Sequence, residues 1–148
     1  MREKHPTEAD IAGMFRSGKN CAQVVATEWA EELEYAEHEC MQMTAAFGGG
    51  CYCGDLCGAA AGAMLVIGLY FGMQDCAENT AAERVREIAL RFREAFEKRF
   101  GSMICRELLG FDFSKEGQYA LAVEAGAQYS KCPLYVHVAL EILDALLL

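Results

Sequence analysis

The sequence has few of the residues and patterns that build sheets and loop-rich folds. Only 2 of its 148 residues are proline, which favours long helices because proline breaks them. No segment alternates apolar and polar residues over strand length, and no Asn-Gly or Asp-Gly pair marks a hairpin turn. These absences predict an all-α fold.

Basic residues are also scarce. Lys and Arg total 13 against 22 for Asp and Glu, so the net charge is −9. A nucleic-acid or anionic-lipid surface attracts basic proteins, so we expect neither as a partner. A basic protein, a neutral small molecule or a metal ion remains open. The first residues lack the apolar run of a secretion signal, which leads us to expect a cytoplasmic protein with reduced thiols.

Length and apolar content predict one domain over residues 1–148, because 53% of the residues are hydrophobic and domains of this size bury a large core. The only long uncharged stretch covers residues 56–74 and contains Gly58 and Gly62. A membrane span needs roughly 20 apolar residues, so a lone span is the alternative. We expect instead a buried central helix, and therefore a single-domain helical bundle around a Gly/Ala-rich apolar helix.

The clearest further helix covers Asn79–Phe100, where apolar residues recur at steps of three and four. Gly101 suits the end of that helix. Additional helices are predicted at residues 7–15, 20–35 and 37–47, in a short segment after Ser102, and from Pro133 to the C-terminal end. Pro133 is expected to be the first residue of that last helix.

Cysteine is the one unusual residue, with eight copies and no C-x-x-C pair. The missing spacing argues against a thioredoxin-type pair, a zinc ribbon and c-type haem attachment. The sequence also lacks an H-E-x-x-H motif and any Ser-His-acid arrangement, so it gives no support for a hydrolase. Glycines beside two closely spaced cysteines let the backbone fold round a bulky group, although a flexible loop with incidental thiols is the alternative. The cofactor-binding candidates of this segment are Gly48, Gly49, Gly50, Cys51 and Cys53.

Four cysteines fall at predicted helix starts, each beside a capping residue or a proline. A helix N-terminus lowers the pKa of a thiol and favours thiolate, the form that binds metals and acts as a nucleophile. Cys40 is predicted to be a packing residue, and Cys76 has no assigned role. The four candidates for redox chemistry and metal binding are Cys21 after Asn20, Cys57 after Asp55, Cys105 after Ser102, and Cys132 before Pro133.

The chain resembles the C_GCAxxG_C_C family of redox-active proteins over about residues 12–145. The resemblance implies that Cys21, Cys57, Cys105 and Cys132 are the family's four cysteines. A related module is similar to part of the split-Soret cytochromes, which carry an iron–sulfur centre beside haem and form dimers. The haem part does not transfer, because the C-x-x-C-H motif is missing. The matching segments are residues 15–25, 47–50, 57–72 and 101–110, and Cys132 with the last helix.

The leading hypothesis is a cytosolic redox protein whose four thiolates bind an iron–sulfur cluster or another soft metal. Cys51 and Cys53 are expected to be able to replace a ligand. Three alternatives remain open: a metal-free thiol–disulfide protein, a structural zinc site, and a non-redox helical binding module with packing cysteines. The apolar surplus and the terminal run 146–148 also lead us to expect a homodimer, with a redox protein as a further partner.

Overall fold

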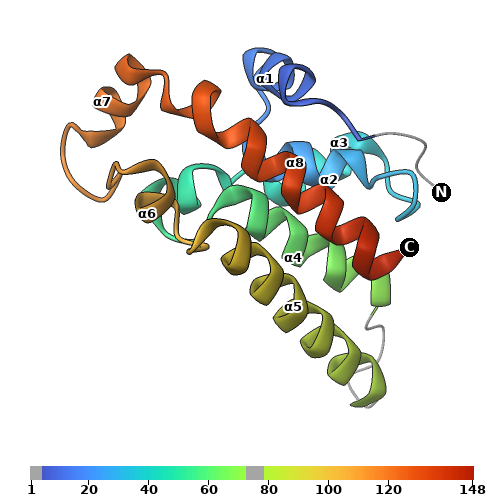
Figure 1. Cartoon of the computed structure of the whole chain (residues 1–148). Coiled ribbons are helices and arrows are strands. Elements are labelled where there is room, and N and C mark those ends of the chain that lie inside the picture. Colours follow the sequence, from blue (N-terminus) through green and yellow to red (C-terminus); the bar gives the residue numbers. More distant parts are fainter. Residues whose placement is uncertain (1–4, 73–78) are drawn as a thin grey trace.

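The computed structural model describes residues 5–72 and 79–148 (Figure 1). Over these ranges the chain is helical and forms no strand, which confirms the all-α prediction; Leu56 and Ile104 form an isolated bridge. The elements in chain order are α1 (Glu8–Arg16), α2 (Cys21–Glu28), α3 (Glu37–Thr44), the short π-type turn η1 (Gly50–Gly54), α4 (Gly58–Phe71), α5 (Asn79–Phe100), α6 (Cys105–Leu109), α7 (Gln118–Ala125) and α8 (Ala127–Leu147).

The central helix is α4, as predicted from its glycines and alanines. A Cβ atom at Gly62 would lie 2.9 Å from the carbonyl oxygen of Ala22, so the backbones of α2 and α4 touch there. The other faces of α4 pack on α5 and α8, which also contact each other and whose axes run in roughly the same direction as that of α4 (Figure 1). In the part of the chain that the structure describes, no helix has the length and hydropathy of a bilayer span.

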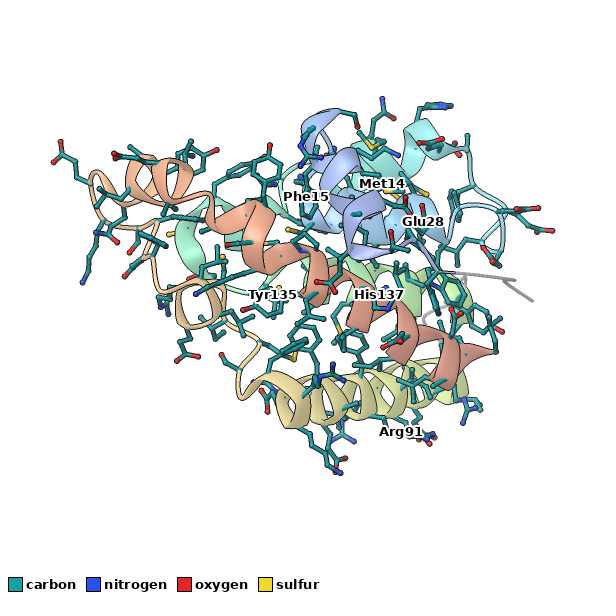
Figure 2. The ribbon with its side chains drawn as sticks, turned by 45° about the horizontal axis from the view of Figure 1, so that its top comes forward. Met14, Phe15, Glu28, Arg91, Tyr135 and His137 are labelled. Atoms are coloured by element: carbon teal, nitrogen blue, oxygen red, sulfur yellow. The ribbon has the colours of Figure 1, made fainter. Side chains whose placement is uncertain are left out.

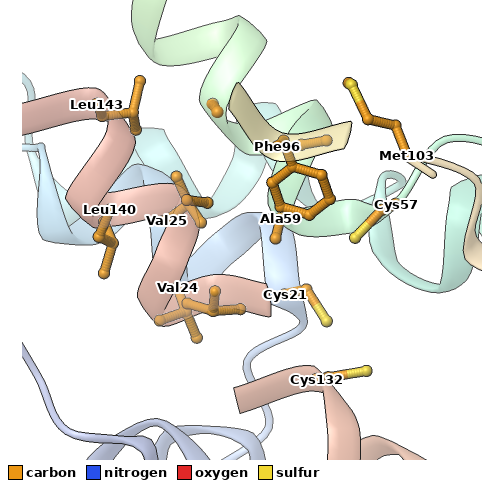
Figure 3. Packing of buried hydrophobic residues seen from close by; sticks show 14 of the residues in the cluster. Cys21, Val24, Val25, Cys57, Ala59, Phe96, Met103, Cys132, Leu140 and Leu143 are labelled. Carbon is orange, nitrogen blue, oxygen red and sulfur yellow. The ribbon is translucent and has the colours of Figure 1, made fainter. Parts of the chain in front are cut away.

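The core is built from apolar stripes on α2, α5 and α8 (Figure 3). The stripe of α5 is fully buried at Ile88, Phe92 and Phe96. Phe92 stacks on Phe96 with ring centroids 5.7 Å apart. The predicted bounds of α5 are correct, because a long amphipathic pattern defines a helix through both its buried stripe and its polar face.

Several predicted helix bounds are wrong. The helices that begin at Cys21 and Glu37 are shorter than expected, ending at Glu28 and Thr44. The last helix begins at Ala127 rather than at Pro133, because the left-handed Gly126 (φ 64) separates it from α7. Pro133 therefore lies inside α8, where it is buried between neighbouring core residues. Such packing outweighs the one helix hydrogen bond that the proline removes.

The described residues near both ends of the chain pack on the bundle. Leu147 is buried, and its carbonyl oxygen accepts a hydrogen bond of 2.8 Å from the Tyr70 hydroxyl. Much of the apolar terminal run is thus used inside the chain, and the homodimer stays a prediction. Before α1, the carbonyl oxygen of Pro6 lies 2.9 Å from Nδ1 of His137 on α8 (Figure 2).

Candidate functional site: a cavity with four thiols

Four cysteines from separate parts of the chain line one cavity of about 370 Å³. All four are buried. Figure 3 shows three of them, Cys21, Cys57 and Cys132, at one end of the apolar core. The fourth, Cys105, begins α6. The structure therefore brings together the four residues that the helix-start pattern singled out.

Cys21 is held by a capped helix start, as predicted. The side-chain oxygen of Asn20 accepts a hydrogen bond of 2.9 Å from the Gln23 backbone N–H. In return, the Gln23 side chain accepts one of 2.9 Å from the Asn20 N–H. Such a reciprocal box satisfies two backbone donors at the helix start and fixes the first turn. Cys21 is the first residue of that turn.

Cys57 and Cys105 are held by two backbone hydrogen bonds between their segments. The Cys57 N–H donates to the Met103 carbonyl (2.7 Å), and the Cys105 N–H donates to the Asp55 carbonyl (2.6 Å). These two hydrogen bonds hold the N-terminal end of α4 against the N-terminal end of α6. They also supply partners for backbone groups that would otherwise be buried without one.

The predicted caps of these two helices are wrong. The Asp55 carboxylate does not cap α4 and instead accepts a hydrogen bond of 2.9 Å from the Arg106 guanidinium. Cys57 itself is the N-cap residue of α4, and Ile104 holds that place in α6. The Ser102 hydroxyl accepts a hydrogen bond of 2.9 Å from the Ile104 N–H, before α6 begins. Sequence alone misplaced both caps because the extended Leu56–Ile104 pairing comes between cap and helix.

Cys132 does not begin a helix, because α8 starts earlier than predicted. It lies in the interior of α8, just before Pro133. Its thiol reaches the cavity because α8 passes over the N-terminal end of α2. There the Cys132 side chain is near enough to the Cys21 thiol to raise its pKa.

The predicted lowering of the thiol pKa is wrong for Cys21, Cys57 and Cys105. Burial raises the pKa of Cys57 from 9.0 to about 12, and burial raises the pKa of Cys105 to about 12. The pKa of Cys21 is raised well above its ordinary value by the Cys132 side chain and by burial. A helix N-terminus stabilises an anion by only ~0.3–1 kcal/mol, whereas three pKa units correspond to ~4 kcal/mol. The cost of desolvation is therefore larger than the stabilisation by the helix N-terminus, and these thiols are neutral at neutral pH.

The glycine-rich loop before α4 is a left-handed turn. Gly49, Gly50, Cys51 and Tyr52 have φ of 59, 63, 55 and 57° in succession. A Cβ at Gly50 would lie 2.4 Å from the Asp55 backbone nitrogen and 2.9 Å from the Cys105 Cβ. The glycine at this position thus lets the loop press against Cys105.

Only part of this loop reaches the cavity. Gly48, Gly49 and Tyr52 line it, whereas Cys51 and Cys53 are exposed to solvent and are not among the lining residues. The two exposed thiols are therefore not placed to replace one of the four buried ones in this arrangement.

The remaining cysteines differ from these groups. Cys40 is fully buried against Ala26 and Ala30 in a second apolar cluster, which agrees with its predicted packing role. Cys76 lies outside the described residues.

The sequence reasoning missed the aromatic residues of the cavity, because it assigned phenylalanine to the core and gave tyrosine no role. The only sequence signal was the run of tyrosines in the segment 119–135. The aromatic residues in the cavity lining are Phe15, Tyr52, Phe113, Tyr119, Tyr129 and Tyr135.

The charge of the cavity differs from that of the whole chain. No carboxylate appears among the described residues that line it, and Lys19 is the charged residue in that lining. The Lys19 ammonium pairs with Glu37 at 2.7 Å. A lining without carboxylates suits groups that become anionic, because like charges would raise their cost further.

Iron–sulfur clusters and single zinc ions differ in the ligands they take and in how those ligands must be spaced. Four thiols are the usual ligand set of an iron–sulfur cluster. A single zinc ion needs its sulfur ligands about 2.3 Å from one centre. In residues 5–72 and 79–148, no three or more His, Cys, Asp or Glu side chains are placed to hold such an ion.

A comparison with protein families gives one match. The family model described as "Putative redox-active protein (C_GCAxxG_C_C)" matches residues 19–146. The chain belongs to this family. The C_GCAxxG_C_C match includes all four cavity cysteines and the glycine-rich loop. No curated protein and no solved structure matches the chain.

Proposed function

We propose that this C_GCAxxG_C_C protein is a redox protein in which Cys21, Cys57, Cys105 and Cys132 hold an iron–sulfur cluster. The observation that carries the proposal is the convergence of four buried thiols on one cavity with no carboxylate in its described lining. When bound, such a cluster supplies one-electron transfer at a potential set by burial and by hydrogen bonds to sulfur.

The raised pKa values support ligation better than exchange chemistry at these thiols. A neutral buried thiol is a poor nucleophile. A metal replaces the thiol proton and supplies the positive charge that burial otherwise withholds. The cavity thiols of Cys57 and Cys105, with pKa about 12, would therefore release protons on ligation, and loading would strengthen as the pH rises.

A cluster and a single zinc ion differ in how they place their sulfur ligands. A zinc ion needs them about 2.3 Å from one centre, whereas a cluster with several metal atoms holds them spread around its surface. In the described ranges no group of three ligands is gathered to hold an ion, so the thiols would have to move on binding either kind of metal group.

The deciding experiment compares two buried cysteines. We would purify the wild-type protein, Cys57→Ser and Cys40→Ser without oxygen, and measure iron, acid-labile sulfide and visible absorbance. Wild type and Cys40→Ser should contain iron and sulfide together, while Cys57→Ser should lose both. Cys40 is the matched control because it is buried in a different cluster. Wild-type protein without iron and sulfide, or equal content in Cys57→Ser, would rule the proposal out.

A second candidate function is a thiol–disulfide protein that uses Cys21 and Cys132. The interaction between these two side chains favours it, because Cys132 is near enough to raise the pKa of Cys21. This candidate predicts redox activity without any metal, so iron and sulfide content separates it from the cluster. Thiol titration before and after mild oxidation then tests the disulfide itself, since a disulfide removes two thiols.

A further inference from the structure

The cavity has an aromatic wall that the four thiols do not use. On one side Phe15 meets Tyr129 edge to face, with ring centroids 6.5 Å apart. On another side Phe113 meets Tyr119 in the same way at 5.4 Å. Small-molecule sites have volumes of ~300–1,000 Å³ and mainly apolar or aromatic walls with a few polar groups. The cavity of about 370 Å³ meets this description.

The mouth of the cavity exposes apolar side chains. Tyr119 is 60% exposed, Val123 63%, Tyr52 60% and Tyr129 45%, and all four belong to the cavity lining. Tyr119 and Val123 lie on α7, which buries only Ala122. This helix stands at the end of the molecule away from α4 and α5 (Figures 1 and 2). Apolar surface gathered at the opening of a pocket is typical of a binding site.

The charges near the cavity indicate which kind of ligand it can bind. Tyrosines can enclose a cation, but here the Arg16 guanidinium already lies 5.5 Å from the Tyr129 ring centroid. Lys19 lines the same cavity with its ammonium paired to Glu37 outside the lining, and no carboxylate among the described lining residues would contact a bound cation. A cationic ligand is therefore disfavoured, whereas a neutral or anionic ring meets no like charge.

We propose that this cavity binds a planar, conjugated, uncharged or anionic ring, such as an isoalloxazine or a quinone, between its aromatic walls. The rings of Tyr119 and Tyr129 would contact its faces or edges, since aromatic pairs prefer offset-stacked or edge-to-face geometry. That the ring exchanges electrons with the thiol centre rests on the proposed function. Its binding rests only on the cavity walls.

Lumiflavin is a suitable probe, because it is a neutral isoalloxazine whose fluorescence falls when it stacks on tyrosine. We would titrate it with wild-type protein in the metal-free form and in the form purified without oxygen. Saturable quenching at one site per chain is the expected result. Absence of saturable quenching in both forms of the wild type would overturn the proposal.

Variants on α7 show whether the wall itself binds the ring. Tyr119→Ala should raise the Kd about fivefold or more, because one aromatic contact is lost. Tyr119→Phe should bind within about twofold of wild type, since the ring face is kept. Leu121→Ala is the matched control: Leu121 is 49% exposed on the same helix but is not in the lining. Wild-type affinity in Tyr119→Ala would contradict the proposal.

A second wall residue covers the case in which Tyr119→Ala misfolds. Tyr129→Ala alters the other aromatic pair of the lining, and it should also raise the Kd while circular dichroism stays helical. Iron and sulfide, measured on the same samples, separate the two proposals. Binding without iron would contradict the cluster alone, and iron without ring binding would contradict the ring site alone.

Discussion

The side chain of Cys132 raises the pKa of the Cys21 thiol, although Cys21 begins α2 and Cys132 lies in the interior of α8. Helix starts alone would not have paired them. The two residues come together because α8 extends over the N-terminal end of α2 and continues through Pro133.

Mild oxidation of metal-free protein should join Cys21 to Cys132. Diamide would take two electrons and two protons from the pair, leaving one disulfide. Peptide mapping should find this bridge, and Cys21→Ser should abolish it. Cys40→Ser should leave it intact, because Cys40 packs in another cluster. A bridge confined to the exposed Cys51 and Cys53 would show that the buried pair is not the redox pair.

Alkylation should distinguish exposed from buried thiols. In metal-free folded protein at pH 8, iodoacetamide should label Cys51 and Cys53 first, because they are exposed. Cys57 should stay unlabelled, since burial raises its pKa to about 12 and leaves little thiolate. Mass spectrometry of timed samples gives the order. Labelling of Cys57 as fast as Cys51 would mean that the helix start, and not burial, controls reactivity.

Stability of the metal-free protein should fall as the pH rises above 9. A thiol whose pKa is raised by folding stabilises the native state fully below its unfolded pKa, and this contribution is lost as the pH rises. For Cys57 and Cys105 the window runs from 9.0 to about 12. At pH 10, each of these two thiols should lower the free energy of unfolding by about 1 kcal/mol.

Urea unfolding at pH 8, 9 and 10 measures this loss. Cys57→Ser should show a flatter dependence on pH, because serine does not titrate there. The exposed Cys51→Ser should keep the slope of wild type. Equal slopes in all three proteins would show that the buried thiols do not titrate on unfolding.

Two glycine substitutions should have opposite effects. Gly50→Ala places a Cβ 2.4 Å from the Asp55 nitrogen at a φ of +63°. It should destabilise by about 2 kcal/mol or more and disturb Cys105. Gly68→Ala meets nothing within 4 Å on α4, so it should stabilise by about 0.5–1 kcal/mol. Thermal unfolding and iron content of both variants check the pair.

The result for Gly50→Ala would show whether the glycine-rich loop has a structural role at the site or is incidental to it. Lost iron with a retained helical spectrum would show that the loop positions Cys105. Unchanged stability and unchanged iron would mean that the left-handed turn can relax without consequence.

Local patterns in the sequence were enough to predict the helices whose two faces differ. The stripe Ile88, Phe92 and Phe96 determines α5, and the Asn20–Gln23 box determines the start of α2. The glycines and alanines of α4 determine that another backbone can approach it, as Ala22 does at Gly62. These features depend on residues within a few positions of each other, so one chain segment carries the whole signal.

The chemistry of the cysteines could not be predicted in the same way. Sequence alone singled out Cys21, Cys57, Cys105 and Cys132, but it assigned them lowered pKa values from helix starts. Burial by distant segments raises the pKa of Cys57 and Cys105 instead, and the Cys132 side chain together with burial raises that of Cys21. The same holds for Asp55, which pairs with Arg106 rather than capping a helix.

The sequence by itself therefore determined the all-α fold, the central small-residue helix and the four cysteines that meet. Only the tertiary structure decided that the thiols of Cys21, Cys57 and Cys105 are neutral, that Cys51 and Cys53 stay in solvent, and that tyrosines from α7 and α8 line the same cavity. The reason is that helix formation follows from short-range periodicity. Desolvation and cavity lining depend on which segments pack together, and the backbone pairing of Leu56 with Ile104 and the early start of α8 set that packing.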